Sequence, residues 1–224
     1  MEEYPKSFKI LICSDTHLGA HEKSLTLRDD CYLAFEEILQ QAVELDVDFI
    51  LHSGDLFHEQ NPTKYCLTKT MDLMRKYLMG EPKQNYQMGR IDRTEDNAYS
   101  ENQSIRYPFY CIHGNHDNRV GVDCISGLDI LETAGLINYI GKHEECIKHN
   151  VETGNDEIVL TPLLFEKGET KLSLYGIGYL PPEKMKKQML SQGMKFLDSG
   201  DDYFKIIMVH QDRVVHGNTK TMFA

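Results

Sequence analysis

Apolar residues of this chain fall into short continuous runs, which alternate with segments where apolar residues recur every three or four positions. Three runs rich in β-branched and aromatic residues predict buried strands: residues 8–14, 48–53 and 109–113. Between the first two runs, Tyr32, Phe35, Leu39 and Ala42 predict one face of a helix that ends near Leu45. This alternation of strand and helix indicates an α/β protein.

A second helix is predicted over residues 63–79. Asn61 and Pro62 are typical of a helix start, because Asn caps free N–H groups and Pro is favoured in the first turn. The apolar stripe of this helix is wider than packing against one sheet needs, and its members are Cys66, Leu67, Met71, Leu73, Met74, Tyr77 and Leu78. Deep burial within the fold and a contact with a second subunit both explain such a stripe.

The second half of the chain is richer in predicted strands. A helix near 123–134 is predicted to end at Gly135, and strands are predicted at residues 158–165, 171–176 and Phe204–Val209. Residues 80–108 hold few large aliphatic side chains among many polar ones, which predicts a long surface insertion. We therefore expect residues 1–224 to form one α/β domain with its sheets arranged as a sandwich.

Composition narrows the class of protein without naming a function. The 224 residues are 41% hydrophobic and 26% charged, as in globular domains, and the apolar runs are too short to cross a membrane. The six cysteines lack paired metal or redox spacing and no signal peptide is evident, so reduced thiols are expected. The net charge of −11 permits local basic surface, and a lysine cluster at 183–195 is either a solvated helix face or a phosphate contact.

Polar residues with metal-binding side chains follow four of the predicted strands. They are Asp15 and His17 after the first run, Asp55 and His58 after the second, Asn115, His116 and Asp117 after the third, and His210 after Phe204–Val209. Because ligands gather beyond the carboxyl edge of open α/β sheets, we expect these side chains to converge. Each alone has an ordinary explanation as a turn, cap or core residue, but four coincidences favour one shared site.

The donor types indicate which chemistry such a site performs. Carboxylate, imidazole and amide donors together suit Mn²⁺, Fe²⁺ or Zn²⁺, whereas softer metals prefer thiolates. A carboxylate such as Asp55 can bridge two cations about 3.5–4 Å apart, a pair that activates water and neutralises a phosphoryl transition state. The glycines before Asp55 and Asn115 let the backbone turn tightly beside a ligand. The pattern therefore predicts a metal site suited to phosphoryl transfer.

Four motifs, SDTHLG, GDLFHE, GNHD and VHQ, resemble in their order those of the calcineurin-like metallophosphoesterases. GDLFHE is similar to the motif in the nuclease subunit of the double-strand-break repair complex, which is the meiotic-recombination-eleven family and the counterpart of bacterial SbcD. The stretches DFILHSGDLFHEQNP, IHGNHD and LYGIGYLP extend the resemblance across nearly the whole chain. The resemblance implies a β-sandwich flanked by helices in αββα order.

The resemblance also implies a set of metal ligands. Asp15 and His17 would hold one Mn²⁺ ion, Asn115 and His210 would hold a second, and Asp55 would bridge the two ions. Each ion would then have three protein ligands once the bridging carboxylate is counted twice.

Three further residues receive catalytic roles from the same resemblance. His116 would protonate the leaving 3′ oxygen, a role that suits an imidazole because its ordinary pKa lies near neutrality. His58 would steady the phosphate, and Asp117 would orient His116. The implied activity is that of a manganese-dependent DNA nuclease, a 3′–5′ exonuclease and single-strand endonuclease.

The resemblance implies partners as well. Members of the family dimerise through the helices that correspond here to residues 63–79 and 123–134, which adds Ile125, Leu128 and Leu131 as expected contacts. Besides DNA, the implied partners are an ABC-type coiled-coil ATPase and, in eukaryotes, a forkhead-associated regulatory subunit that binds partly through residues 80–108. The insertion implies a nuclear protein, and no membrane partner is expected.

One feature of the family pattern is missing from the 224 residues. The pattern continues past VHQ to a Gly-His-x-His motif that supplies one more ligand to each metal. We therefore expect either a fragment that is truncated before its last strands or a shortened protein that binds Mn²⁺ weakly. A non-catalytic dimerisation scaffold and a metallophosphatase remain alternatives to the nuclease.

Overall fold

The computed structural model describes residues 6–83, 85–90, 96–100, 103–119, 123–142, 147–150 and 155–211. Its first sheet has four parallel strands in the order β1 (Ile10–Cys13), β2 (Phe49–His52), β4 (Phe109–Cys111) and β5 (Asn138–Tyr139). β2 and β4 are buried, but β1 is an edge strand whose Ile12 is 65% exposed, so the expectation of a buried first strand is wrong. Parallel pairing brings the carboxyl ends of these strands to one edge of the sheet.

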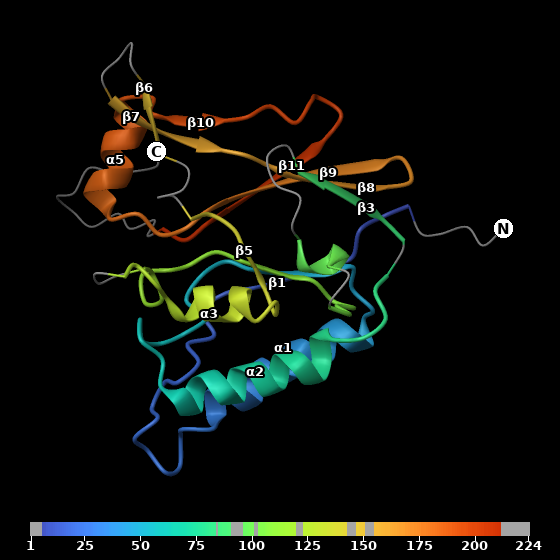
Figure 1. Ribbon diagram of the computed structural model, residues 1–224, viewed down its shortest axis with the longest axis vertical. Helices are drawn as coiled ribbons and strands as arrows, with labels where there is room; N and C mark the ends of the chain where they lie inside the picture. The colour runs from blue at the N-terminus through green and yellow to red at the C-terminus, as the bar shows by residue number, and fades with distance from the viewer. Residues whose placement is uncertain are drawn as a thin grey trace, which may run out of the picture.

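Three helices lie on one side of this sheet (Figure 1): α1 (Asp30–Glu44), α2 (Lys64–Leu78) and α3 (Gly127–Thr133). The prediction for α1 is confirmed, because Tyr32, Phe35, Leu39 and Ala42 are its buried residues. α2 begins later than Pro62, since the Thr63 hydroxyl caps it by accepting the backbone N–H of Cys66 at 3.1 Å.

α3 also begins later than its pattern predicts. A capping box formed by Ser126 and Asp129 fixes its start, and Gly135 follows its end with a left-handed φ of 72°, as predicted. Among the described residues, none of the helices combines the length and the apolar character needed to cross a membrane.

The wide apolar stripe of α2 is explained within this fold. Cys66, Met74 and Leu78 are buried, and the remaining members, Leu67, Met71, Leu73 and Tyr77, pack partly buried against the same core. Leu128 and Leu131 of α3 are fully buried too, so the expectation that they contact a second subunit is wrong. Ile125, which is 56% exposed, stays available for such a contact.

A second sheet packs on the other face of the first, and the two form the predicted sandwich (Figure 1). Its strand order is β11 (Phe204–Val209), β9 (Thr170–Ile177), β8 (Leu163–Lys167) and β3 (Gln87–Arg90). Aromatic side chains fill the space between the sheets, with Phe49 of β2 stacked on Phe165 of β8 at 4.8 Å between ring centroids. This packing fixes β11 opposite the first sheet.

The predicted single strand at residues 158–165 is wrong, because the chain changes sheets within it. β7 (Asn155–Leu160) ends before Pro162 and pairs with β6 (Ile147–Asn150) and β10 (Met194–Phe196) in a small third sheet. Proline lacks the N–H that a ladder needs, which favours a break there. Helix α5 (Pro182–Leu190) packs with β7 and β9 through Met185.

Residues 80–108 are not a surface insertion throughout, and that expectation is wrong for their two ends. β3 pairs antiparallel with β8, and Tyr86 just before it is buried. Near the other end, Ile105 and Tyr107 are buried as well. Between them lies one short 3₁₀ helix, η1 (Asn97–Tyr99), and residues 91–95 and 101–102 fall outside the described part of the chain.

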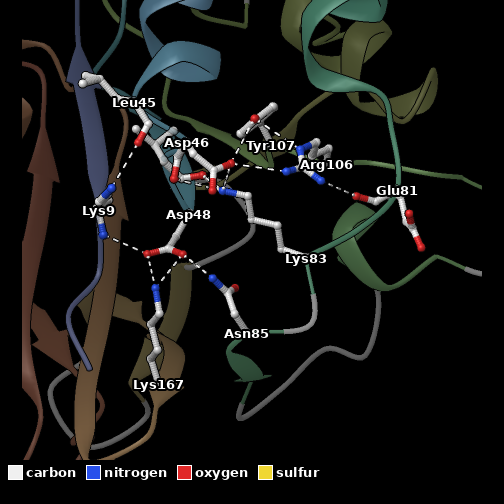
Figure 2. Close-up of polar contacts among 11 residues, drawn as sticks. Lys9, Leu45, Asp46, Asp48, Glu81, Lys83, Asn85, Arg106, Tyr107 and Lys167 are labelled. Carbon is white, nitrogen blue, oxygen red and sulfur yellow. Dashed lines mark hydrogen bonds and ion pairs between the residues drawn. The ribbon is translucent and has the colours of Figure 1, made fainter. Parts of the chain in front are cut away.

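A buried carboxylate, that of Asp48, joins three parts of the chain (Figure 2). Both oxygens of Asp48 lie 2.8 Å from the Lys167 ammonium group, and this pair is almost fully buried. The Lys9 backbone N–H donates to one of these oxygens at 2.8 Å, and the Asn85 side-chain amide donates to the other at 3.0 Å. Asp48 thus ties β1, the end of β8 and the segment before β3 to the start of β2.

Candidate metal centre

The ends of β1 and β2 remain paired beyond the strands themselves. The Asp15 N–H donates to the Gly54 carbonyl at 3.1 Å, and the His17 N–H donates to the Asp55 carbonyl at 3.1 Å. Asp15, His17 and Asp55 all have left-handed backbone conformations, with φ of 56°, 44° and 54°. Such conformations cost energy in non-glycine residues and persist where the surroundings impose them, which is frequent at functional sites. The backbone therefore holds these three side chains in one place.

Asp15, His17 and Asp55 form the first cluster. One ligand atom of each lies within 4.8 Å of the others. His17 Nε2 is 3.9 Å from Asp15 Oδ1 and 3.7 Å from Asp55 Oδ2, and the Ser14 hydroxyl donates to the Asp15 carboxylate. These separations exceed hydrogen-bond length, and they leave room for a cation between the donors.

Asp55 is the centre of the site. Its carboxylate is nearly buried, and the backbone N–H of His116 donates to Oδ1 at 2.9 Å. Its other oxygen, Oδ2, faces the Nε2 atoms of two imidazoles, those of His17 and His210. Burial opposes ionisation of Asp55, but His210 and the His116 N–H outweigh it and lower its pKa. Asp55 thus presents one carboxylate to two imidazoles, that of His17 and that of His210.

His210 reaches the site from β11 of the second sheet. Its Nδ1–H donates to the Ser53 carbonyl at 2.8 Å, which turns Nε2 toward Asp55 Oδ2 at 3.5 Å. The facing carboxylate raises the pKa of His210 to about 9, because the pair favours a positive charge at this point. A cation bound between Asp55 and His210 would supply positive charge in place of the proton on Nε2, so the arrangement suits a metal ligand.

Two glycines allow these close approaches. A Cβ on Gly54, where φ is 101°, would lie 2.6 Å from His210 Nδ1. A Cβ on Gly114 would lie 2.0 Å from Asp55 Oδ1. Asn115 follows Gly114 directly and has an exposed side chain, so the structure places it on the loop that carries His116 to Asp55. Both loops need glycine because a Cβ would displace the side chain of His210 or of Asp55.

His58 and His116 join His17 in a second cluster, made of three partly buried imidazoles. The His58 and His116 rings are stacked, with centroids 5.2 Å apart, and His17 lies edge-on to His116 at 4.8 Å. His116 Nδ1–H donates to the His58 carbonyl at 2.9 Å, which leaves Nε2 as the nitrogen with the lone pair in the neutral ring. His116 is therefore oriented by His58.

Asp117 does not take the role predicted for it. Its carboxylate is fully buried and accepts three backbone N–H groups: Gly114 at 2.7 Å, Leu56 at 2.7 Å and Phe57 at 3.2 Å. Burial raises the pKa of Asp117 to about 6. The expectation that it orients His116 directly is wrong in this structure, because it instead ties together the two loops that carry Asp55 and Asn115.

Sequence reasoning missed His52, which supports the site from behind. The His52 ring is fully buried in β2, and its Nε2 lies 3.1 Å from the Thr16 hydroxyl, which donates to the Leu56 carbonyl at 3.2 Å. This chain of contacts fixes Thr16 between Asp15 and His17. Burial lowers the pKa of His52 to about 3, so the ring is neutral. The sequence offered one sign of this role, since His52 is a polar residue inside the apolar run 48–53.

The residues present fit divalent cations. The donors are two carboxylates and two imidazoles with an amide on the adjoining loop, which is the donor set that Mn²⁺ and related cations accept. The predicted convergence of strand ends is seen for Asp15, His17, Asp55 and His210.

The comparisons with known proteins agree with this geometry. The family model of the calcineurin-like phosphoesterases matches residues 8–221. Double-strand break repair protein MRE11 of Mus musculus is 35% identical over 95% of this chain, and that of Encephalitozoon cuniculi is 38% identical over 92%. MRE11 of Oryza sativa subsp. indica is 34% identical over 96%. These alignments cover 30%, 34% and 32% of the relatives, so the chain spans about a third of their length. The chain belongs to the calcineurin-like phosphoesterase family, and the resemblance to the MRE11 group within it is confirmed.

Proposed function

We propose that this chain is the nuclease domain of a double-strand-break repair protein and that it hydrolyses DNA phosphodiesters with two Mn²⁺ ions. One observation carries the proposal: a single buried oxygen, Asp55 Oδ2, faces imidazole nitrogens from two different sheets at 3.7 Å and 3.5 Å. In this proposal Asp15 and His17 hold one ion, Asn115 and His210 hold the other, and Asp55 holds both.

Such ions supply an activated water and neutralise the charge of the phosphate. The remaining work falls to side chains of this chain. His116, whose Nδ1–H is fixed on the His58 carbonyl, presents Nε2; in the protonated ring this nitrogen would carry the proton that passes to the leaving oxygen. The stacked His58 ring lies beside it and is placed to contact the same phosphate. Asp117 holds both loops in register through its three backbone contacts.

DNA is the proposed substrate, and a basic helix next to the site supports that choice. The side-chain amide of Gln211, which follows His210, donates to the Leu180 carbonyl at 3.0 Å, so α5 begins close to the strand end that carries the ligand. α5 carries Lys184, Lys186 and Lys187. Positive charge beside a phosphodiesterase site attracts a nucleic-acid backbone. Both 3′–5′ exonuclease and single-strand endonuclease activities are proposed.

The remaining parts of the proposal concern the assembly. The MRE11 relatives are named for double-strand break repair, which supports a nuclear protein that works in a complex. We propose a homodimer with contacts near residues 63–79 and 123–134, an ABC-type coiled-coil ATPase partner, and a forkhead-associated subunit that binds through residues 80–108.

A direct assay tests the activity. The chain is freed of metal with a chelator, supplied with Mn²⁺ and incubated with single-stranded DNA or with nitrophenyl phosphate. We expect Mn²⁺-dependent cleavage of DNA, and a loss of about 10²–10⁴-fold in His116→Asn, because a general acid contributes that much. His21→Asn is the control, since His21 is exposed and has a left-handed φ that Asn tolerates. Equal background rates for all three proteins would refute catalysis, and cleavage of nitrophenyl phosphate alone would identify a phosphatase.

A further inference from the structure

Three imidazoles face one another at the edge of the proposed active site, and their geometry resembles a metal site of its own. A nitrogen of each of His17, His58 and His116 lies within 4.8 Å of a nitrogen of the other two. All three side chains are partly buried, and the rings are held by mutual contacts with centroids 4.8–5.4 Å apart. Imidazoles gathered in this way offer neutral nitrogen donors, in contrast to the carboxylates on the other side of His17.

The closest nitrogens have the separation that a bound ion requires. His17 Nδ1 lies 3.4 Å from His58 Nδ1, which is long for a hydrogen bond. Two nitrogens bound to tetrahedral Zn²⁺ at about 2.0–2.1 Å are about 3.3–3.4 Å apart. Two facing ring nitrogens must share something positive between their lone pairs, and this is either a proton or a cation.

The contact that His116 makes with the His58 carbonyl decides which of its nitrogens has a lone pair to offer. The His58 carbonyl can only accept, so His116 Nδ1 must carry the proton of that 2.9 Å contact. The lone pair of the neutral His116 ring is therefore on Nε2.

We propose that His17 through Nδ1, His58 through Nδ1 and His116 through Nε2 form a second metal site that takes Zn²⁺ in preference to Mn²⁺. Three imidazoles without a carboxylate suit Zn²⁺, which accepts three histidines and a water in a tetrahedral arrangement. Mn²⁺ is the weakest binder among the divalent first-row metals and is suited by carboxylate donors. The two sites thus select different ions.

His17 makes the two sites mutually exclusive. Its Nε2 faces Asp15 and Asp55, and its Nδ1 faces His58. A neutral imidazole has one lone pair, so an ion on Nε2 requires a proton on Nδ1, and that proton is then donated to His58 Nδ1. An ion on Nδ1 reverses the arrangement and removes His17 from the carboxylates. Zn²⁺ therefore weakens the binding of a cation by Asp15 and Asp55.

Zinc binding does not rest on the proposed nuclease function, although its effect on activity does. Zn²⁺ at the three imidazoles takes the lone pair of His116 together with that of His58. The residues proposed to meet the substrate are then withheld, so Zn²⁺ is expected to inhibit hydrolysis in the presence of Mn²⁺. An experiment can therefore refute the inhibition of hydrolysis by Zn²⁺ without refuting the binding of Zn²⁺ to the three imidazoles.

The first experiment counts bound Zn²⁺ by titration calorimetry on the metal-free chain. The double variant Asp15→Asn/Asp55→Asn removes both carboxylates while Asn at 55 can still accept the His116 N–H. We expect this variant to bind one Zn²⁺, and addition of His58→Asn or His116→Asn to weaken binding by at least about tenfold. Addition of His21→Asn is the matched control and should leave the affinity unchanged. Binding that is lost in the double variant, or retained without His58, overturns the proposal.

A second experiment uses the unaltered chain, so that no variant has to fold. Nitrogen NMR of the histidine side chains is recorded before and after one equivalent of Zn²⁺. We expect the Nδ1 resonances of His17 and His58 and the Nε2 resonance of His116 to shift. A shift at His17 Nε2 in place of Nδ1 places the ion with the carboxylates and overturns the proposal, whatever the DNA-cleavage assay shows.

Discussion

Removing the ammonium group that faces Asp48 should destabilise the whole domain. In Lys167→Met the apolar stem is kept, but the carboxylate stays almost fully buried with only the Lys9 N–H and the Asn85 amide as donors (Figure 2). Removal of one partner of a buried ion pair lowers the free energy of unfolding by about 3–5 kcal/mol, because the remaining charge is left without a partner and out of contact with water. A domain of this size then melts about 6–20 °C lower.

The size of the effect is measured by urea unfolding and a thermal scan of the metal-free chain. Lys171→Met is the matched control, because Lys171 also contacts a carboxylate, that of Asp202 at 2.6 Å, but on the exposed surface, where water screens the pair. Asp48→Asn/Lys167→Met should recover part of the loss, since the neutral amide still accepts the Lys9 N–H. If Lys167→Met is no less stable than Lys171→Met, the argument from buried charge is refuted.

Three further predictions concern the site and its support. Gly114→Ala should weaken Mn²⁺ binding by about 10–100-fold in calorimetry while the fold is kept, because a Cβ would lie 2.0 Å from Asp55 Oδ1; unchanged affinity would contradict this. The pKa of His52 is about 3 in the folded protein and about 6.5 in the unfolded chain. Between these pH values the unfolded state binds more protons, so the free energy of unfolding decreases as the pH is lowered. At pH 5 this costs about 2 kcal/mol relative to pH 7.5, and urea unfolding of His52→Leu should lack that part of the loss. Phe165→Ala should cost about 3–5 kcal/mol in the same assay, because Phe165 is fully buried between the sheets; a cost below that of a surface change would contradict the packing.

The fold was predictable where the spacing of the apolar residues is regular. The four buried positions of α1 repeat at helical spacing, and Phe204–Val209 is the strand that its apolar run predicts. The segment 80–108 was misjudged because its few large side chains, such as Tyr86 and Tyr107, are scattered among polar residues. The burial of Tyr86 depends on β8, which lies far along the chain, because Tyr86 and β8 share the core between the two sheets.

The convergence of the candidate ligands was predictable, but the contacts that support them were not. Strand ends in a parallel sheet must meet at one edge, and that rule was enough to bring Asp15, His17 and Asp55 together. Asp117 and His52 contact groups on other loops: Asp117 accepts the backbone N–H of Leu56, and His52 contacts the side-chain hydroxyl of Thr16. No local spacing in the sequence encodes such contacts.

The Asp48–Lys167 pair also bears on how the chain matures during synthesis. The two partners are 119 residues apart, so the ribosome has released the first half of the domain well before Lys167 emerges. Until then β2 begins with a carboxylate that cannot enter the interior without a counter-charge. The two sheets can therefore close over Asp48 only after Lys167 has been synthesised.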